Sequence, residues 1–151
     1  MLDDTDRRIL RYLMADPGMA LSDLAERAGV TGSTLTRRLD RLRRRGLIGT
    51  VQAVVDWKAL GYEVEVSLRV TLDKTQPRAF DEFIQGARDV PEVLEIQTFL
   101  GQVDVRLLIV ARDMAHYQRL YREHLLTLPH ITDIEALMHV ARVFENEALP
   151  L

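Results

Sequence analysis

The sequence contains no cysteine, and this absence excludes several classes of protein. Disulfide-stabilised scaffolds, thiolate zinc sites and cysteine nucleophiles all require that residue. No stretch approaches the roughly 20 apolar residues that a membrane-spanning helix needs, and Met1–Arg8 carries acids and arginines where a secretion signal would be apolar. We therefore expect a protein of the reducing cytoplasm that is neither secreted nor membrane-spanning and that is stabilised by packing.

Acidic residues outnumber basic residues, so the formal net charge is −3. This net charge alone argues weakly against binding to a phosphate backbone. The two signs are distributed unevenly along the chain, however. Residues 1–60 hold eleven Lys and Arg against eight acids, whereas residues 61–151 hold nine against fifteen. Such asymmetry indicates a module that faces nucleic acid, joined to a part with another role.

Three short helices are predicted within the first 50 residues. Asp3 and Asp6 have the spacing of an N-terminal helix cap, and a second helix over 21–28 ends at Gly29, which tolerates the positive φ of a tight turn. Thr31 can cap a third helix. The apolar positions of that helix recur at helical spacing and are Leu35, Leu39 and Leu42. This arrangement is typical of a helix-turn-helix.

The outward face of the third helix is cationic and rich in hydroxyl groups, since residues 31–50 hold six arginines and one acid, Asp40. The planar fork of arginine binds guanine edges or phosphates, and hydroxyl groups at a helix start bind either. A charge run can also be only a solvated face, but the helix-turn-helix spacing favours DNA. The residues that we expect to contact DNA are Ser33, Thr34, Thr36, Arg37, Arg38, Arg41 and Arg44. Among them, we assign Ser33, Thr34 and Arg37 to bases and the later arginines to phosphates.

The rest of the sequence predicts an α+β domain. Residues 47–55 are β-branched and alternating, which predicts a strand or wing. The elements expected after it are a strand over 64–72, a helix after Pro77 that turns Phe80, Phe83, Ile84 and Ala87 inward, strands over 93–99 and 103–110 joined by a tight turn at Gly101–Gln102, a helix over 114–128 and a strand over 131–140.

This order is β-α-β-β-α-β, the ferredoxin-like arrangement. The predicted organisation is a helix-turn-helix in 1–50, a strand or linker in 51–62 and a ferredoxin-like domain in 63–151. A sheet with helices on one face leaves its other face open, which favours a homodimer.

Taken together, these motifs resemble the Lrp/AsnC family of feast/famine regulators over nearly the whole chain. The segments that carry the resemblance are LDDTDRRIL at 2–10, LAERAGVT at 24–31, RLDRLRRRGLI at 38–48, the G-x-x-D pattern at 101–104 and the L-x-x-LP pattern at 125–129. The resemblance implies a winged helix-turn-helix that binds double-stranded operators of two-fold symmetry. It also implies dimers joined through the C-terminal domains, often assembled further into tetramers or octamers, and an amino-acid effector.

The same resemblance implies an effector site between dimers, against the hairpin turn and the end of the last strand. In this sequence those positions are Gly101, Gln102 and Asp104, with Leu137, Met138 and His139 nearby. Asp104 either holds an α-amino group by a charge-assisted hydrogen bond or caps the turn, and the sequence leaves both roles open. At Gln102 and Val103 the sequence departs from the acid and the aromatic that many members carry.

Other classes of function fit the sequence less well. A related branch of the fold decarboxylates sirohaem with histidines and aromatics that the hairpin FLGQVDVRLL lacks, so we expect no enzyme and no cofactor. His116 and His124 lie eight apart and not at the i, i+4 spacing of paired metal ligands, so we expect no metal site. An oligomerising interaction protein without DNA binding is the remaining alternative, and the arginine-rich helix argues against it.

Overall fold

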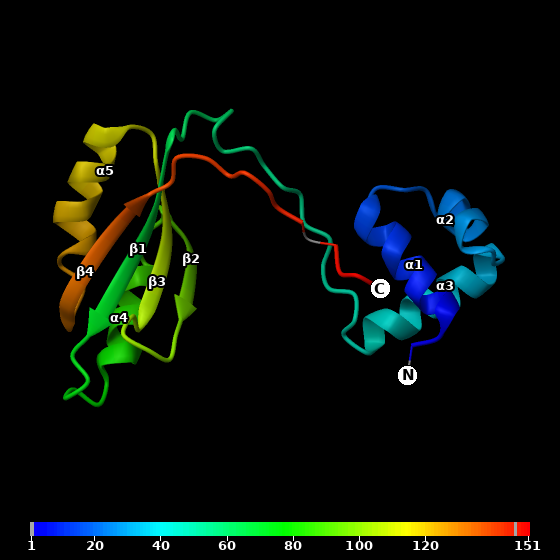
Figure 1. Ribbon diagram of the computed structural model, residues 1–151, viewed down its shortest axis with the longest axis horizontal. Helices are drawn as coiled ribbons and strands as arrows, with labels where there is room; N and C mark the ends of the chain where they lie inside the picture. The colour runs from blue at the N-terminus through cyan, green and yellow to red at the C-terminus, as the bar shows by residue number, and fades with distance from the viewer. Residues whose placement is uncertain (1, 147) are drawn as a thin grey trace. The chain divides into compact units, whose positions relative to one another are not determined.

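The computed structural model describes residues 2–146 and 148–151, which form two units (Figure 1). The first unit combines the chain up to Val54 with residues 143–151, and the second spans Val55–Arg142. Sequence reasoning assigned residues 143–151 to the C-terminal domain, whereas the structure groups this segment with the N-terminal unit. There Leu151 contacts the helical core, and the Arg11 guanidinium donates a 2.8 Å hydrogen bond to the Leu151 carbonyl.

The first unit consists of three helices, α1 (Asp4–Ala15), α2 (Leu21–Ala28) and α3 (Gly32–Arg44). At the start of α1 the predicted cap is confirmed, because the Asp6 N–H donates to the Asp3 carboxylate at 2.8 Å and the Asp6 carboxylate accepts from the Asp3 N–H. Gly29 ends α2 with a φ of 68°, a left-handed conformation that glycine adopts without strain. These local signals fix where each helix begins and ends.

The core of the first unit is made by the inward stripes of the three helices. Its buried members are Ile9, Leu10, Leu24, Ala25, Ala28, Leu35, Leu39 and Leu42. Burying a leucine or isoleucine side chain contributes about 1.5 to 3 kcal/mol, so this cluster dominates the stability of the unit. The leucines that we expected to back α3 are confirmed as its inward face.

The segment that joins the two units has no regular strand, so the strand predicted over 47–55 is not present. The alternation of β-branched residues is present, but Val51, Val54 and Val55 are exposed and no neighbouring strand pairs with them. A strand needs a partner for its backbone hydrogen bonds, and sequence alternation alone does not supply one.

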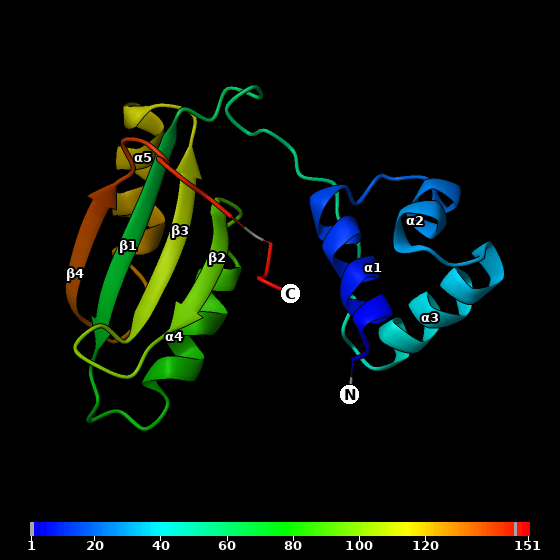
Figure 2. The same ribbon diagram turned by 45° about the vertical axis from the view of Figure 1, so that its right-hand side comes forward.

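The second unit is a four-stranded antiparallel sheet with helices on one face, as Figures 1 and 2 both show. Its strands are β1 (Val64–Leu72), β2 (Val93–Thr98), β3 (Val105–Ala111) and β4 (Ile131–Met138). The spatial order is β2-β3-β1-β4, which confirms the expected ferredoxin-like arrangement. Helix α4 (Ala79–Arg88) and helix α5 (Met114–Leu120), which continues as the π-helical turn η1 (Tyr121–Leu125), lie against the same face of the sheet.

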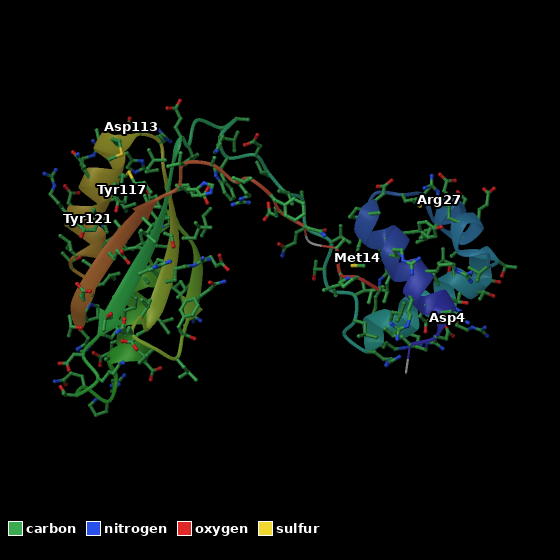
Figure 3. All side chains as sticks on the ribbon, viewed as in Figure 1. Asp4, Met14, Arg27, Asp113, Tyr117 and Tyr121 are labelled. Atoms are coloured by element: carbon green, nitrogen blue, oxygen red, sulfur yellow. The ribbon has the colours of Figure 1, made fainter. Side chains whose placement is uncertain are left out.

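The core of this unit lies between the sheet and its helices. Alternate residues of β1 point to the helices, so Leu68 and Val70 are fully buried while Arg69 is exposed. Tyr117 and Tyr121 come from successive turns of one helical segment, and their ring centroids are 5.9 Å apart (Figure 3).

Two details of the second unit differ from the sequence-based expectation. Phe80 is 37% exposed and does not point inward, because the buried stripe of α4 runs through Ala79, Phe83 and Ala87 and leaves Phe80 a quarter-turn away. The hairpin between β2 and β3 is longer than a two-residue turn, since β3 begins only at Val105.

No helix among the described residues is long and apolar enough to cross a membrane.

Candidate nucleic-acid interface

The N-terminus of α3 carries a group of hydroxyl side chains. The Thr31 hydroxyl oxygen accepts the Thr34 N–H at 3.3 Å, which caps the helix as predicted. The same hydroxyl lies 3.0 Å from the Thr34 hydroxyl and 3.2 Å from the Ser33 hydroxyl. Thr36 donates to the Gly32 carbonyl at 3.0 Å. The start of α3 therefore presents hydroxyl groups that can donate and accept hydrogen bonds.

Further along the outer face of α3, arginine side chains reach solvent. Arg37 and Arg44 are exposed, and no hydrogen bond or ion pair of either is found with the described part of the chain. Arg43 lies 3.6 Å from Asp40, an exposed i, i+3 pair of little energetic weight. Basic residues in the last turn also suit the negative end of the helix dipole. Arg37 and Arg44 are thus available to bind an anion.

Arg38 and Arg41 behave differently, because both pair with a buried carboxylate on α1. Arg38 Nη1 lies 2.8 Å from Asp6 Oδ1 and 2.6 Å from Asp3 Oδ2. Arg41 Nη2 lies 2.8 Å and 2.7 Å from the two oxygens of Asp6, whose side chain has no solvent exposure. These contacts tie α3 to α1. The prediction that both arginines bind DNA stays a prediction, but their guanidinium groups already have partners within the unit.

The network stabilises the charged form of both acids. Burial acts most strongly on Asp6 and works to raise its pKa, but the hydrogen bonds from Arg38, Arg41 and the Asp3 N–H together outweigh burial, so the pKa lies below the usual 3.8. The hydrogen bond from Arg38 likewise lowers the pKa of Asp3. Both carboxylates are therefore ionised at neutral pH, and their charges offset those of Arg38 and Arg41.

Sequence reasoning missed this network. The cap spacing of Asp3 and Asp6 was visible, but their partners lie 32 to 35 residues away along the chain. The signal that was available is the i, i+3 spacing of Arg38 and Arg41, which places the two arginines together at the flank of α3. Nothing in that spacing identifies α1 as the element they face.

In the second unit, the hairpin loop is held to β1 by Asp104. This residue is 3% exposed. Its Oδ2 accepts the Leu72 N–H at 2.9 Å, its own N–H donates to the Val70 carbonyl at 3.0 Å, and its Oδ1 lies 3.3 Å from Lys74 Nζ. The Asp104 carboxylate therefore holds the loop to β1, and no side-chain hydrogen bond from it to its own turn is found among the described residues. Gly101 and Gln102 are exposed at the tip of the loop, where the Gln102 carbonyl accepts from the Thr71 hydroxyl.

The other residues expected at an effector site lie elsewhere in the chain. Met138 pairs with Val66 and Leu137 with Ser67, and the His139 N–H donates to the Glu65 carbonyl. Val66 and Val70 are four positions apart on β1, which corresponds to about 13 Å along a strand. A single copy of the chain therefore does not bring Leu137, Met138 and His139 to the hairpin loop.

Acidic side chains lie beside His116, His130 and His139 in the second unit. His130 Nε2 lies 2.6 Å from Glu82, and His116 Nε2 lies 3.4 Å from Glu92. Within residues 2–146 and 148–151, no group of three or more potential ligands is arranged to hold a metal ion.

Comparison with known proteins matches both parts of the chain. A family model described as the Lrp/AsnC ligand binding domain matches residues 65–149, and one described as winged helix-turn-helix DNA-binding matches residues 2–48. The chain is 28% identical to the proline dehydrogenase transcriptional activator of Rhodobacter capsulatus, over 98% of this chain and 96% of that protein. It is also 28% identical to the leucine-responsive regulatory protein of Escherichia coli K12, over 98% of this chain and 90% of that protein.

A solved structure shows the same fold. It is a transcriptional regulator from Neisseria meningitidis in complex with L-Met, with a TM-score of 0.90 and 24% identity over 99% of this chain and 97% of that one. The order of the two units is therefore shared with proteins that regulate transcription.

Proposed function

Because the chain belongs to the Lrp/AsnC family of transcriptional regulators, we propose that it reads duplex DNA with the outer face of α3 and responds to an amino acid or related small molecule. In this role the chain is a regulator and not an enzyme. The observation that carries the DNA-binding part is the contrast between the two sides of α3. One side is a buried leucine stripe, and the other presents exposed Ser33, Arg37 and Arg44.

The proposed contacts follow from the chemistry of the major groove. Ser33, Thr34 and Thr36 lie in the first turns of α3, the part of a helix-turn-helix that approaches base edges. Arg37, one turn further, has the reach and the planar fork to bind guanine at both acceptors. Arg44, near the end of the helix, is placed for a phosphate. Arg37 therefore contributes specificity and Arg44 contributes salt-dependent affinity.

The test of this assignment begins with fragments selected by binding from the source genome. Arg37→Ala should weaken binding to a selected duplex by about 5- to 150-fold, since a bidentate base contact contributes about 1 to 3 kcal/mol. Arg88→Ala is the matched control, because it removes the same charge from an exposed site on α4 in the other unit. Equal affinity of the two variants, measured by fluorescence anisotropy, would remove α3 as the reading surface.

The proposed assembly is a homodimer that associates further into tetramers or octamers. Both helices cover one face of the sheet, so the opposite face is left for a second copy (Figure 2). A dimer with two-fold symmetry places two α3 helices on one operator, which matches DNA half-sites of the same symmetry. Analytical ultracentrifugation at several concentrations tests this proposal, and a strictly monomeric chain contradicts it.

The proposed effector site is the loop that carries Gly101, Gln102 and Asp104. In its support, the Asp104 carboxylate has one oxygen on a backbone N–H and the other on the exposed ammonium of Lys74, so an α-amino group can take the place of that ammonium. Leu137, Met138 and His139 join the site only if a second copy brings them there. The name of the leucine-responsive relative supports an amino acid as ligand.

A thermal-shift screen against the twenty amino acids tests the effector proposal. Asp104→Ala is a poor probe, because it also removes the partner of the Leu72 N–H. Gln102→Glu is better, since the Gln102 side chain is exposed and only its backbone carbonyl holds the loop. We expect at least one amino acid to raise the Tm of the wild type and Gln102→Glu to change that shift. A wild type that responds to none of the twenty rules the proposal out.

A further inference from the structure

Four of the five arginines of α3 divide into two sets according to what they contact, and the fifth, Arg43, forms only the exposed pair with Asp40. Arg37 and Arg44 are exposed and have no hydrogen-bond or ion-pair partner among the described residues. Arg38 and Arg41 pair with a carboxylate of α1. The two sets lie on the same helix, so their difference comes from what they face and not from residue type.

The carboxylate at the centre of this network is Asp6. Its side chain is fully buried and accepts three hydrogen bonds of 2.7 to 2.8 Å from the two guanidinium groups. Both of its oxygens are bound to Arg41, and one is shared with Arg38. Charge-assisted bonds of this length are the strong ones, and a buried carboxylate requires them because burial without partners is costly.

Little of the Arg38 guanidinium is left for another ligand. Its Nη1 bridges Asp6 and Asp3, its Nε is buried without a partner among the described atoms, and its side chain is 22% exposed. Arg41 is 46% exposed, but its Nη2 is bound to both oxygens of Asp6. The two positive charges are offset locally by two negative ones.

We propose that Asp6 is a positioning residue for DNA binding, which holds Arg38 and Arg41 off the duplex and leaves Arg37 and Arg44 as the cations presented to it. The inference rests on the proposed function, because it concerns which cations of α3 meet the DNA. Its consequence is that Asp6 limits sequence-independent binding. Contacts to phosphates contribute affinity without sequence information. If Arg38 and Arg41 make no phosphate contacts, a larger share of the binding free energy comes from contacts to bases.

The salt dependence of DNA binding separates the two sets of arginines. Each phosphate contact contributes about 0.9 to the slope of log K against log salt concentration. We expect Arg44→Gln to flatten the slope by about 0.9 and Arg41→Gln to leave it unchanged. Arg41→Gln keeps Arg38 as a partner for Asp6, so the unit is expected to stay folded. A slope that Arg41→Gln flattens as much as Arg44→Gln does overturns the inference.

Releasing the two arginines gives the complementary experiment. Asp6→Asn should steepen the slope, by up to about 1.8 if both arginines reach phosphates, and should raise affinity for unselected DNA. Asp4→Asn is the matched control, since Asp4 is exposed on the same helix and the change of charge is identical. The triple change Asp6→Asn, Arg38→Gln and Arg41→Gln should restore the wild-type slope while stability stays low.

A purely structural role for Asp6 gives a different result. In that case Asp6→Asn lowers the Tm but leaves the slope at the wild-type value at temperatures where circular dichroism shows folded protein, and the inference is wrong. If Arg44→Gln has no effect on DNA binding, the proposed function of α3 fails. If Arg44→Gln acts as expected and Asp6→Asn matches Asp4→Asn, only the present inference fails.

Discussion

Asp6 in the first unit and Asp104 in the second are the charged residues that the described structure buries, and they are satisfied in different ways. Asp6 is enclosed by two guanidinium groups that come from another helix. Asp104 binds one backbone N–H and one lysine ammonium that is largely in solvent. The first arrangement joins two helices, whereas the second includes a partner that is largely exposed. A buried carboxylate therefore indicates a structural tie in one unit and a candidate binding group in the other.

The largest expected effect on stability comes from removing the carboxylate of Asp6. Asp6→Ala removes the acceptor that Arg41 shares with Arg38, leaves Arg38 with Asp3 alone, and removes the Asp6 half of the capping box at α1. We expect the free energy of unfolding to fall by about 3 kcal/mol, because breaking a buried ion pair from one side is strongly destabilising. Urea denaturation followed by circular dichroism measures it. Asp4→Ala, an exposed change on the same helix, should cost less than about 0.5 kcal/mol. Similar losses for both would refute the distinction.

Acid should reproduce part of that loss. The pKa of Asp6 is lower in the folded chain than its usual 3.8, so its pairing contributes in full above that value and is lost as the pH falls through the folded pKa. We expect the stability of the first unit to decline below about pH 4, and Asp6→Asn to show a shallower decline. Tm measured from pH 6 to pH 2.5 in both proteins tests the sign. If the Tm of Asp6→Asn declines as steeply with falling pH as that of the wild type, acids other than Asp6 cause the loss.

Removing the carboxylate of Asp104 should have a smaller effect on the free energy of unfolding. Asp104→Ala leaves the Leu72 N–H without its acceptor, and an unsatisfied buried donor costs about 1 to 3 kcal/mol. We expect a smaller loss than for Asp6→Ala, because the group left without its acceptor is a neutral N–H and not a charged guanidinium. The same urea experiment measures the change. A loss that equals or exceeds that of Asp6→Ala would invert the comparison between the two carboxylates.

The smallest effect on stability is expected from removing Lys74, the exposed partner of Asp104. Lys74 is 60% exposed in its side chain, and exposed ion pairs contribute about 0 to 1 kcal/mol. Lys74→Ala should therefore change the free energy of unfolding by less than about 0.5 kcal/mol. If Lys74→Ala costs as much as Asp104→Ala, the lysine is an integral part of the loop and Asp104 resembles Asp6 in being held by a structural ion pair.

Much of the fold followed from local patterns in the sequence. The cap at Asp3, the left-handed turn at Gly29 and the leucine stripe of α3 are set by residues within a few positions of one another, and all are present. The strand expected over 64–72 is likewise present, as β1. Short-range signals of this kind need no knowledge of the partner element.

Apart from the orientation of Phe80, the main features that sequence reasoning missed depend on a partner distant in the chain. Residues 47–55 alternate like a strand but find no neighbour to pair with. The hairpin before Val105 is longer than expected, and the Asp104 carboxylate within it is bound to β1. The pairing of Asp6 with the arginines of α3 spans more than 30 residues. Charge and spacing identified α3 as a cationic helix but did not show which cations are already bound.

Side-chain NMR of arginine tests the central claim most directly, because it reports each guanidinium separately. In a titration of the full chain with a selected duplex, the Nε–Hε signals of Arg37 and Arg44 should shift on binding, while those of Arg38 and Arg41 stay where they are in the free protein. Shifts confined to Arg38 and Arg41, or an unperturbed α3, would contradict the account.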